Sequence, residues 1–159
     1  MGKFSRKGTT KILFTDTIAA AATTMLPTRV ELTGATKLTP SIAAIDGFSV
    51  ENQQIDTPTM EATFDAKIPG SDQASDSTIT FYEDDTDNDI ETTLAKGSEG
   101  FVIILRKGDV PASTSMDIYP VRVASISPQY TTDNEAAKFA VMFSITEPPV
   151  IGAAVPAAT

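Results

Sequence analysis

Alternation of apolar and polar residues is the strongest pattern along the chain. Over residues 138–146, Phe139, Val141, Phe143 and Ile145 fall on one face, which is typical of a strand with one buried side. The same two-residue period predicts half-buried strands in further segments, at 28–33, 59–65, 78–82 and 118–126. The sequence therefore predicts a mainly β protein.

Two of these strands assign particular side chains to faces. In the strand predicted over 59–65, the apolar residues point inward, and the outward face carries Glu61, Thr63 and Asp65. In the strand predicted over 118–126, one face carries Tyr119, Val121, Val123 and Ser125. Residues 101–105 differ because they are apolar throughout, as expected of a strand that is covered on both faces. We expect a second sheet on one side of it and a helix on the other.

One short helix is predicted, at about residues 88–96. Asn88 is placed to cap its start, Glu91 follows three residues later as in a capping box, and Gly97 fits the left-handed position after its end. Ile90 and Leu94 then form its apolar stripe. Two turns are too short to persist alone, so we expect the helix to pack on the neighbouring strands.

A long loop and a distinct C-terminal composition frame the expected domain. Residues 34–56 lack a clear period, and a loop of this length is usually functional or held by a partner. Its apolar residues are our candidates for contacts with a neighbouring subunit: Leu38, Ile42, Ile45, Phe48 and Val50. We expect a basic N-terminal arm over 1–15, a single β domain over 16–147 and a Pro/Ala-rich tail over 148–159.

Composition restricts the chemistry. The chain has 159 residues, enough for one domain with its own core, and 41% of them are hydrophobic. It contains no Cys and no His, which excludes thiol nucleophiles, disulfides, an imidazole base and zinc-type clusters. No catalytic set is recognisable among the other residues, so we expect a protein that is not an enzyme and that needs no cofactor or metal.

Charge is distributed unevenly. The first eleven residues carry Lys3, Arg6, Lys7 and Lys11 and no acidic residue. The rest of the chain has 8 basic against 21 acidic residues, a formal charge of -13, which should repel nucleic-acid phosphates. A secretory signal is not expected, because Asp16 interrupts the apolar stretch after the basic start, and no membrane-spanning segment is expected.

The densest acidic cluster lies over residues 83–91. The spacing of Asp85, Asp87 and Asp89 resembles a calcium loop, but Ile90 stands where a glycine is needed and Lys96 where a bidentate glutamate is needed. A solvated acidic loop before a helix is the simpler interpretation. The two glycines of residues 97–100 lack the Lys-Ser/Thr of a phosphate loop and indicate a turn.

Taken in order, these features resemble the major tail tube proteins of long-tailed bacteriophages, particularly siphophages of actinobacteria. The resemblance covers about residues 30–146. The segments that carry it are Phe64–Gly70, Asp76–Asp85, Phe101–Ile104 leading to Lys107–Asp109, Asp117–Val123 and Phe139–Thr146.

The resemblance implies a two-sheet β-sandwich or barrel-like fold, assembled as hexameric rings that stack into a hollow tail tube. DNA would pass through the lumen without specific binding, and the partners would be further copies, the tape measure, the terminator and the distal tail protein. The protein would reside in the virion tail, after assembly in the host cytoplasm. Glu61, Thr63 and Asp65 become candidates for a lumen or surface acidic face, and the basic arm and the long loop become candidates for ring-to-ring contacts.

Two alternatives stay open at this point. A monomeric β-sandwich binding or adhesion module is one, although such modules often stack sugars on exposed aromatic rings, and this chain has no Trp and only Tyr82, Tyr119 and Tyr130. Another virion subunit, such as a tail terminator or a capsid decoration protein, is the other.

Overall fold

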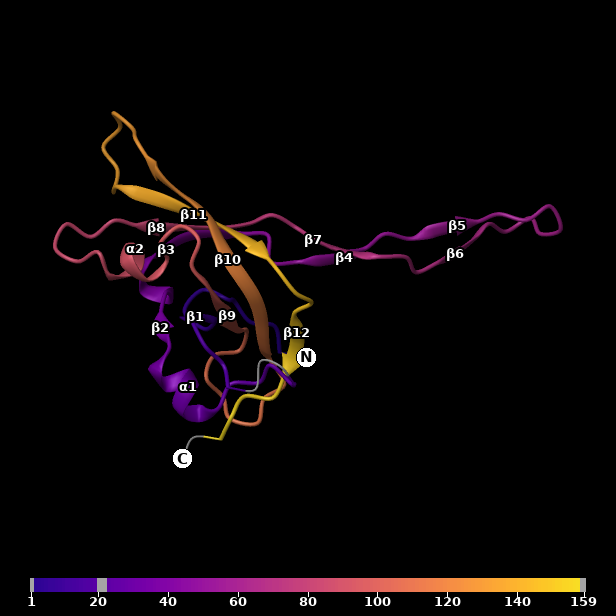
Figure 1. Ribbon diagram of the computed structural model, residues 1–159, viewed down its shortest axis with the longest axis horizontal. Coiled ribbons are helices and arrows are strands. Elements are labelled where there is room, and N and C mark those ends of the chain that lie inside the picture. Colours follow the sequence, from indigo (N-terminus) through magenta and orange to yellow (C-terminus); the bar gives the residue numbers. More distant parts are fainter. Residues whose placement is uncertain (1, 20–22, 158–159) are drawn as a thin grey trace.

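A curved antiparallel sheet forms the body of the molecule in the computed structural model, which describes residues 2–19 and 23–157 (Figure 1). Eight of the strands in these ranges belong to it, in the order β2-β1-β9-β10-β11-β8-β3, with β12 also paired to β10. Their bounds are β1 Lys11–Thr15, β2 Thr36–Lys37, β3 Ile42–Asp46, β8 Ser77–Tyr82, β9 Glu99–Leu105, β10 Met116–Gln129, β11 Lys138–Ile145 and β12 Val150–Ala153. The expected mainly β, barrel-like fold is confirmed.

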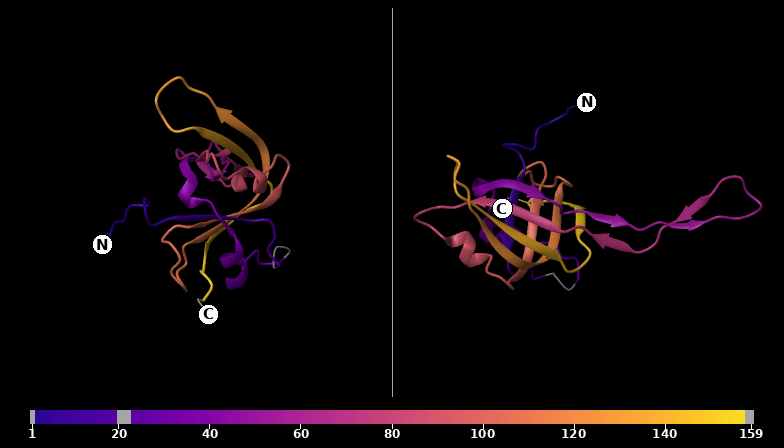
Figure 2. Two further views of the ribbon diagram at one scale, coloured as in Figure 1. Left: turned by 90° about the vertical axis from the view of Figure 1, so that its left-hand side faces the viewer. Right: turned by 90° about the horizontal axis from the view of Figure 1, so that it is seen from above.

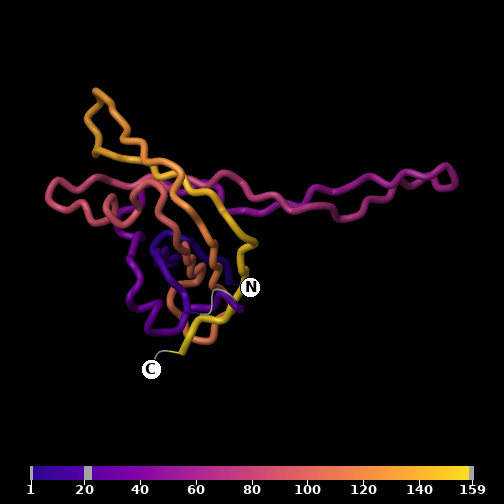
Figure 3. The backbone as a smooth tube through the Cα atoms, in the orientation of Figure 1, coloured from indigo at the N-terminus to yellow at the C-terminus, as the bar shows by residue number. Residues whose placement is uncertain are grey.

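Short helices and a second set of strands complete the described chain. The helical segments are α1 Arg29–Gly34, the 3-10 turn η1 Thr39–Ser41 and α2 Asp89–Thr93. The remaining strands are β4 Val50–Asn52, β5 Ile55–Thr57, β6 Ala66–Ile68 and β7 Asp72–Ala74. These last four form a two-stranded ribbon that extends away from the body (Figures 1 and 3).

Strand β10 is the centre of the sheet. β9 pairs along one of its edges, and the other edge is shared by β12 and then β11. The register against β11 shifts between Val123 and Ser125. Such a bulge moves the following side chains to the opposite face, so Ile126 rather than Ser125 packs against the core. The alternation predicted over 118–126 therefore holds only as far as Val123.

The apolar side chains gather in two clusters, one on each face of the β1-β9-β10 part of the sheet. The first lies inside the curve, where Val102 of β9 packs with residues of β8, β10 and β11. The second lies on the outer side, where Ile103 of β9 packs with Leu32 of α1 and with Val155 near the C-terminus. Val102 and Ile103 are both fully buried, so β9 is covered on both faces, as its continuous apolar run predicts.

The helix on the outer side of β9 is α1, in a segment predicted as a strand. The prediction was wrong because Val30 and Leu32 alternate over too few residues: Leu32 is buried, whereas Val30 is 81% exposed. The Thr28 hydroxyl accepts a hydrogen bond from the Glu31 backbone N–H at 3.3 Å and donates to the Glu31 carboxylate at 3.2 Å. This is a helix N-terminus with a reciprocal cap, a signal that the sequence already contained.

The second helix is confirmed in a shorter form. α2 spans Asp89–Thr93 rather than residues 88–96, and the Asn88 side chain makes no capping hydrogen bond. Leu94, directly after it, is fully buried in the first cluster, and Ile90 packs against that cluster. Gly97 has φ +88°, the left-handed conformation expected after the helix.

Both ends of the described chain differ from the expected basic N-terminal arm and Pro/Ala-rich tail. Residues 11–15, which the basic N-terminal arm was expected to include, form β1 within the sheet. Residues 150–153 form β12, and Val155 is 2% exposed, so the segment after residue 148 contributes to the sheet and the core. The sequence did not predict this strand, because the segment is rich in Pro and Ala and a strand of four residues is too short to show a clear alternation.

Arg29 fastens the C-terminal segment to the body. Its guanidinium donates two parallel hydrogen bonds to Asp109, at 2.8 and 3.0 Å, and further ones to the carbonyls of Pro156 and Ala157. The hydrogen bonds from Arg29 lower the pKa of Asp109, and the charge of Lys11 acts in the same direction. One side chain thus joins the start of α1, the loop after β9 and the last described residues.

Truncation on either face of β9 should destabilise the fold. We expect Ile103→Ala to lower the free energy of unfolding by about 2 to 5 kcal/mol and Val102→Ala by about 1.5 to 3 kcal/mol, measured by urea unfolding. Met142→Ala, on the outward face of β11 where Met142 is 43% exposed, is the control and should change it by about 0.5 kcal/mol or less. A loss at only one of the two β9 positions would contradict the double covering.

The Arg29–Asp109 ion pair should make stability depend on pH in the acid range. Because the folded state holds the pKa of Asp109 below its ordinary value, the contribution is present above the unfolded pKa of about 4 and is lost as pH falls through the lowered folded value. Urea unfolding should therefore show Asp109→Asn less stable than the natural protein near neutral pH, with the difference shrinking below about pH 3. Asp85→Asn, which removes none of the described ion pairs, should change the free energy of unfolding at neutral pH by about 0.5 kcal/mol or less.

Candidate functional site

The ribbon formed by residues 49–75 is the most prominent surface feature, and we call it the arm. It contains two antiparallel ladders in series, β4 with β7 and β5 with β6. Figure 1 shows it leaving the body on one side, and the view from above in Figure 2 shows that it stays extended along its whole length. No other described segment reaches as far from the sheet.

The base of the arm is held by Phe48. Gly47 and Phe48 both have positive φ, of 85° and 57°, and this turn redirects the chain from β3 into the arm. A Cβ on Gly47 would overlap the Asp76 carbonyl, so only glycine fits there. The Phe48 ring is 7% exposed and lies 5.4 Å from the Tyr119 ring between centroids, and the Phe48 N–H donates to the Ser77 hydroxyl at 2.9 Å.

A joint between the two ladders is bridged by Asn52. Its side-chain amide donates to the Gly70 carbonyl at 2.9 Å and accepts from the Gly70 N–H at 3.0 Å. The side chain thereby replaces a backbone partner between β6 and β7, where Pro69 has no N–H to donate. The Gln53 N–H donates to the Ser71 carbonyl at 2.8 Å on the same stretch. The register shifts by one residue across the joint, because residues 53–54 of one strand lie opposite residues 69–71 of the other.

None of the residues 49–75 is buried, although several are large and apolar. Met60 and Phe64 at the tip are 105% and 80% exposed, and Ile55 and Ile68 in the outer ladder are 51% and 49% exposed. A two-stranded ribbon without a packed face is marginally stable in water, and exposed apolar side chains in series mark an interaction site. The arm therefore has the properties of a surface that is completed by a partner.

The strand predicted over 59–65 is absent, because these residues form the tip of the arm between β5 and β6. The apolar residues alternate there, but no second sheet lies opposite them to bury that face. Pro58 and Pro69, on either side of the segment, also argue against a central strand. Glu61, Thr63 and Asp65 are accordingly exposed at the arm tip and do not lie on a face of the body sheet. Their role as a lumen surface stays a prediction.

The apolar candidates for subunit contacts divide into three groups. Leu38 and Phe48 are buried in the first core cluster of their own chain, so they have no side-chain surface left for a neighbour. Ile42 is partly buried against the same cluster. Ile45 at 44% and Val50 at 39% exposure are on the surface, the first on edge strand β3 and the second at the arm base.

The basic candidates of the N-terminus lie on the surface. Lys3, Arg6 and Lys7 are exposed in a segment that leaves the body in a different direction from the arm (Figure 2). Lys11 is exposed at the start of β1. None of the ion pairs among the described residues involves Lys3, Arg6 or Lys7.

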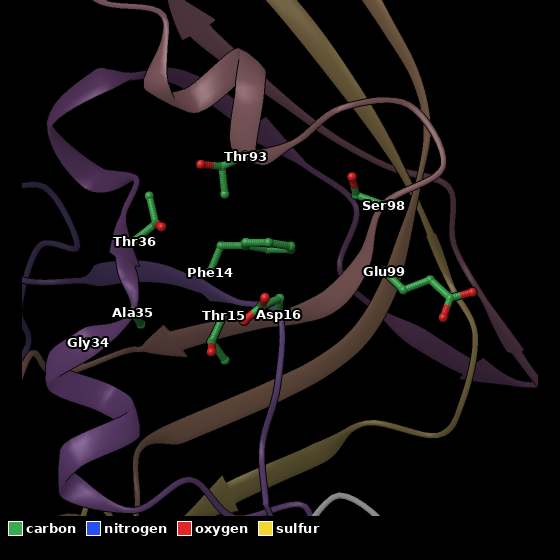
Figure 4. Close-up of a pocket in the computed structure, with 9 residues that line it drawn as sticks. All are labelled: Phe14, Thr15, Asp16, Gly34, Ala35, Thr36, Thr93, Ser98 and Glu99. Carbon is green, nitrogen blue, oxygen red and sulfur yellow. The ribbon is translucent and has the colours of Figure 1, made fainter.

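Among the described residues, those that line the cleft beside β1 and β9 form no recognisable catalytic arrangement. The cleft in Figure 4, about 500 Å³, lies between the end of β1, the residues after α1 and the start of β9. Its titratable side chains are Asp16 and Glu99, and the figure shows the Glu99 carboxylate directed away from Thr36 and Thr93. The other lining groups are hydroxyls, a phenyl ring and backbone, and nothing in the cleft activates a nucleophile.

The acidic loop before α2 does not gather metal ligands. Within the described ranges, no group of three or more acidic side chains is placed to hold a metal ion. The Asp84 carboxylate accepts from the N–H and hydroxyl of Thr86, which lowers the pKa of Asp84. The nearby Asp87 charge raises the pKa of Asp89. No helix in the same ranges has the length and hydropathy to cross a membrane.

The described residues thus form a mainly β body with a long exposed arm and show no recognisable catalytic arrangement. The family model of the phage tail tube proteins matches residues 1–158, so the chain belongs to the phage tail tube protein family. It is a structural tail protein and not an enzyme. Among curated proteins, no match was found.

Solved structures share the fold at low sequence identity. The sheath/tube terminator of PVC, an extracellular contractile injection system in its extended state, has a TM-score of 0.65 and 11% identity, covering 96% of this chain and 99% of that chain. The extended PVC sheath-tube complex has a TM-score of 0.56 and 13% identity, covering 90% of this chain and 88% of that chain. The tail of an empty gene transfer agent particle, with C6 symmetry, has a TM-score of 0.55 and 11% identity, covering 95% of this chain and 100% of that chain. At these identities the likeness is one of fold.

The arm should be dispensable for folding of the body. We expect that replacing residues 52–72 with Asn-Gly, which closes the Glu51–Gln73 pair by a two-residue hairpin turn, leaves the melting temperature within a few degrees of the natural value. The reason is that the removed residues bury no side chain in the core. Circular dichroism during heating measures this. Loss of the cooperative transition would contradict the independence of body and arm.

Proposed function

We propose that this chain is the tail tube subunit of a long-tailed phage particle, assembling as six-membered rings that stack into a hollow conduit for DNA. The observation that carries the proposal is the arm, an extended ribbon whose apolar side chains are all left exposed in one isolated copy. Family membership supports the tube assignment. The C6 symmetry of the gene transfer agent tail and the six-fold symmetrised injection-system baseplate support the ring number.

The open edge of the sheet supports ring formation. β3 pairs with β8 on one side only and ends the strand order of the sheet. Natural proteins protect such edges with charged side chains, proline or bulges. β3 has a register shift between Ile42 and Ala44, but the residues after it, Ala44 and Ile45, are neither charged nor proline. A strand of a neighbouring copy along this edge would satisfy its free backbone groups and join the sheets of successive subunits around the ring.

The acidic charge of the body supports passage of DNA. From residue 12 onward the chain carries a formal charge of -13, so a bore lined by such subunits would repel phosphates and let DNA slide without adhesion. In the particle the subunit would contact the tape measure, the terminator and the distal tail protein, within the virion tail after assembly in the host cytoplasm. We also propose that the phage is a siphophage with an actinobacterial host, and this part of the proposal rests on the sequence resemblance alone.

A tube terminator is the second candidate. The PVC sheath/tube terminator matches this chain over nearly its whole length, with a TM-score of 0.65 against 0.56 for the sheath-tube complex. A terminator forms a ring that ends the tube, whereas a tube subunit must offer complementary surfaces on both sides of its ring. The two functions therefore differ in whether pure protein grows beyond one ring. A monomeric adhesion module is not favoured by any of the matches.

Self-assembly of the pure protein tests the proposal. Negative-stain electron microscopy and mass photometry over a concentration series should show rings and then hollow tubes, and the variant with residues 52–72 replaced by Asn-Gly should not form tubes. Single rings that never elongate would support the terminator. A 16.8 kDa monomer at every concentration would count against both functions.

A further inference from the structure

We infer that the arm tip of one copy docks onto the basic N-terminal segment of another copy. The arm tip is residues 58–65, and the basic segment is residues 3–11. This inference rests on the proposed assembly and adds to it the partner of the arm, which is a second copy of this chain bound through opposite charges and exposed apolar side chains. The argument starts from the charges of the two segments.

The whole arm and the basic segment carry equal and opposite formal charge, and two of the acidic side chains of the arm, Glu61 and Asp65, lie at its tip. The arm has five acidic side chains and one lysine, a formal charge of -4, in the residues Glu51, Asp56, Glu61, Asp65, Lys67 and Asp72. The basic segment has four basic side chains and no acidic one, a formal charge of +4. In a chain with a net charge of -9, overall repulsion between copies opposes assembly, whereas contact between these two oppositely charged segments would be attractive.

The arm tip and residues 3–7 take part in none of the ion pairs described within one copy, whereas Lys11 lies in β1, where its charge acts on Asp109. Lys67 pairs with Asp56 inside the arm, at 3.5 Å, which leaves Glu51, Glu61, Asp65 and Asp72 without a basic partner among the described ion pairs. The basic segment and the arm leave the body in different directions, as the right-hand view of Figure 2 shows. The charges of a single copy therefore cannot neutralise each other, and a second copy is needed.

Apolar groups accompany the charges on both sides. The tip places Met60 and Phe64, 105% and 80% exposed, directly beside Glu61 and Asp65. The basic segment places Phe4, 53% exposed, under the Arg6 guanidinium at 6.0 Å from the ring centroid. Burying these side chains between copies would supply the affinity, and the charges would set the orientation.

Charge reversal tests the contact. The variant Lys3→Glu, Arg6→Glu, Lys7→Glu and, separately, the variant Glu61→Lys, Asp65→Lys should each slow tube assembly at least about 10-fold at low ionic strength, followed by light scattering and electron microscopy. The protein that carries all five substitutions should regain assembly, because the charges are again opposite. Assembly of the natural protein should slow as salt is raised towards about 1 M.

Matched variants separate a specific contact from overall charge. Lys37→Glu, Lys96→Glu, Lys107→Glu makes the same change in charge at exposed lysines elsewhere and should assemble at a near-natural rate. Asp85→Lys, Asp133→Lys should fail to rescue the N-terminal reversal. Melting temperatures of all variants should match that of the natural protein, since every substituted side chain is exposed.

Disulfide trapping gives a second measurement that is independent of charge. The natural chain has no cysteine, so Lys7→Cys with Glu61→Cys in one protein should form a ladder of disulfide-linked multimers on oxidation, and either single variant at most dimers. No ladder in tubes that otherwise form, or unimpaired assembly of the N-terminal reversal, would overturn the inference while the proposed function stands. Unimpaired assembly of the N-terminal reversal is also the result expected if the basic segment contacts DNA instead of another copy. Failure of the natural protein to assemble would count against both the inference and the proposed function.

Discussion

The burial of Phe48 is the interaction on which the functional surface depends. An arm of 27 residues, 49–75, without a buried side chain has no core that could fix its direction, so its orientation must come from its base. There the Phe48 ring is inserted between Tyr119 and Phe143, and the positive φ of Gly47 and Phe48 sets the angle at which the chain leaves β3. The stable body and the exposed arm are thus joined through one ring and one turn.

That anchor requires a body that is itself rigid, and the double covering of β9 provides it. A sheet with one buried face would need a partner sheet. Here the sheet curls so that β8 and β11 cover one face of β9, while α1 and the C-terminal segment cover the other. Arg29 fastens that second layer by bonding to Asp109 and to the carbonyls of Pro156 and Ala157. Apolar burial on both sides supplies most of the stability, and the ion pair determines where the last residues lie.

The division between a self-sufficient body and an incomplete arm is consistent with a subunit that folds first and assembles afterwards. The body satisfies its own apolar groups. The edge of β3, the apolar tip of the arm and the basic N-terminal segment are left open, and in the proposed assembly each would be completed by another copy of the same chain. Opposite charges on two segments of one chain favour contact between copies over contact within a copy only because the fold directs the segments apart (Figure 2).

Local sequence determined the strands with a continuous pattern, the two-faced burial of β9, the short helix α2 and the absence of catalytic chemistry. These follow from side-chain period and residue type, which act over a few neighbouring positions. Tertiary structure alone decided the rest. The alternation at 59–65 is as regular as that of β11, but no second sheet lies opposite it, so its apolar face stays in solvent. Leu38 and Phe48 look like contact residues in an aperiodic loop, yet the curl of the sheet buries both in the core of the same chain. Whether an apolar side chain is buried or offered to a partner depends on what the fold brings opposite it, and that information is not local.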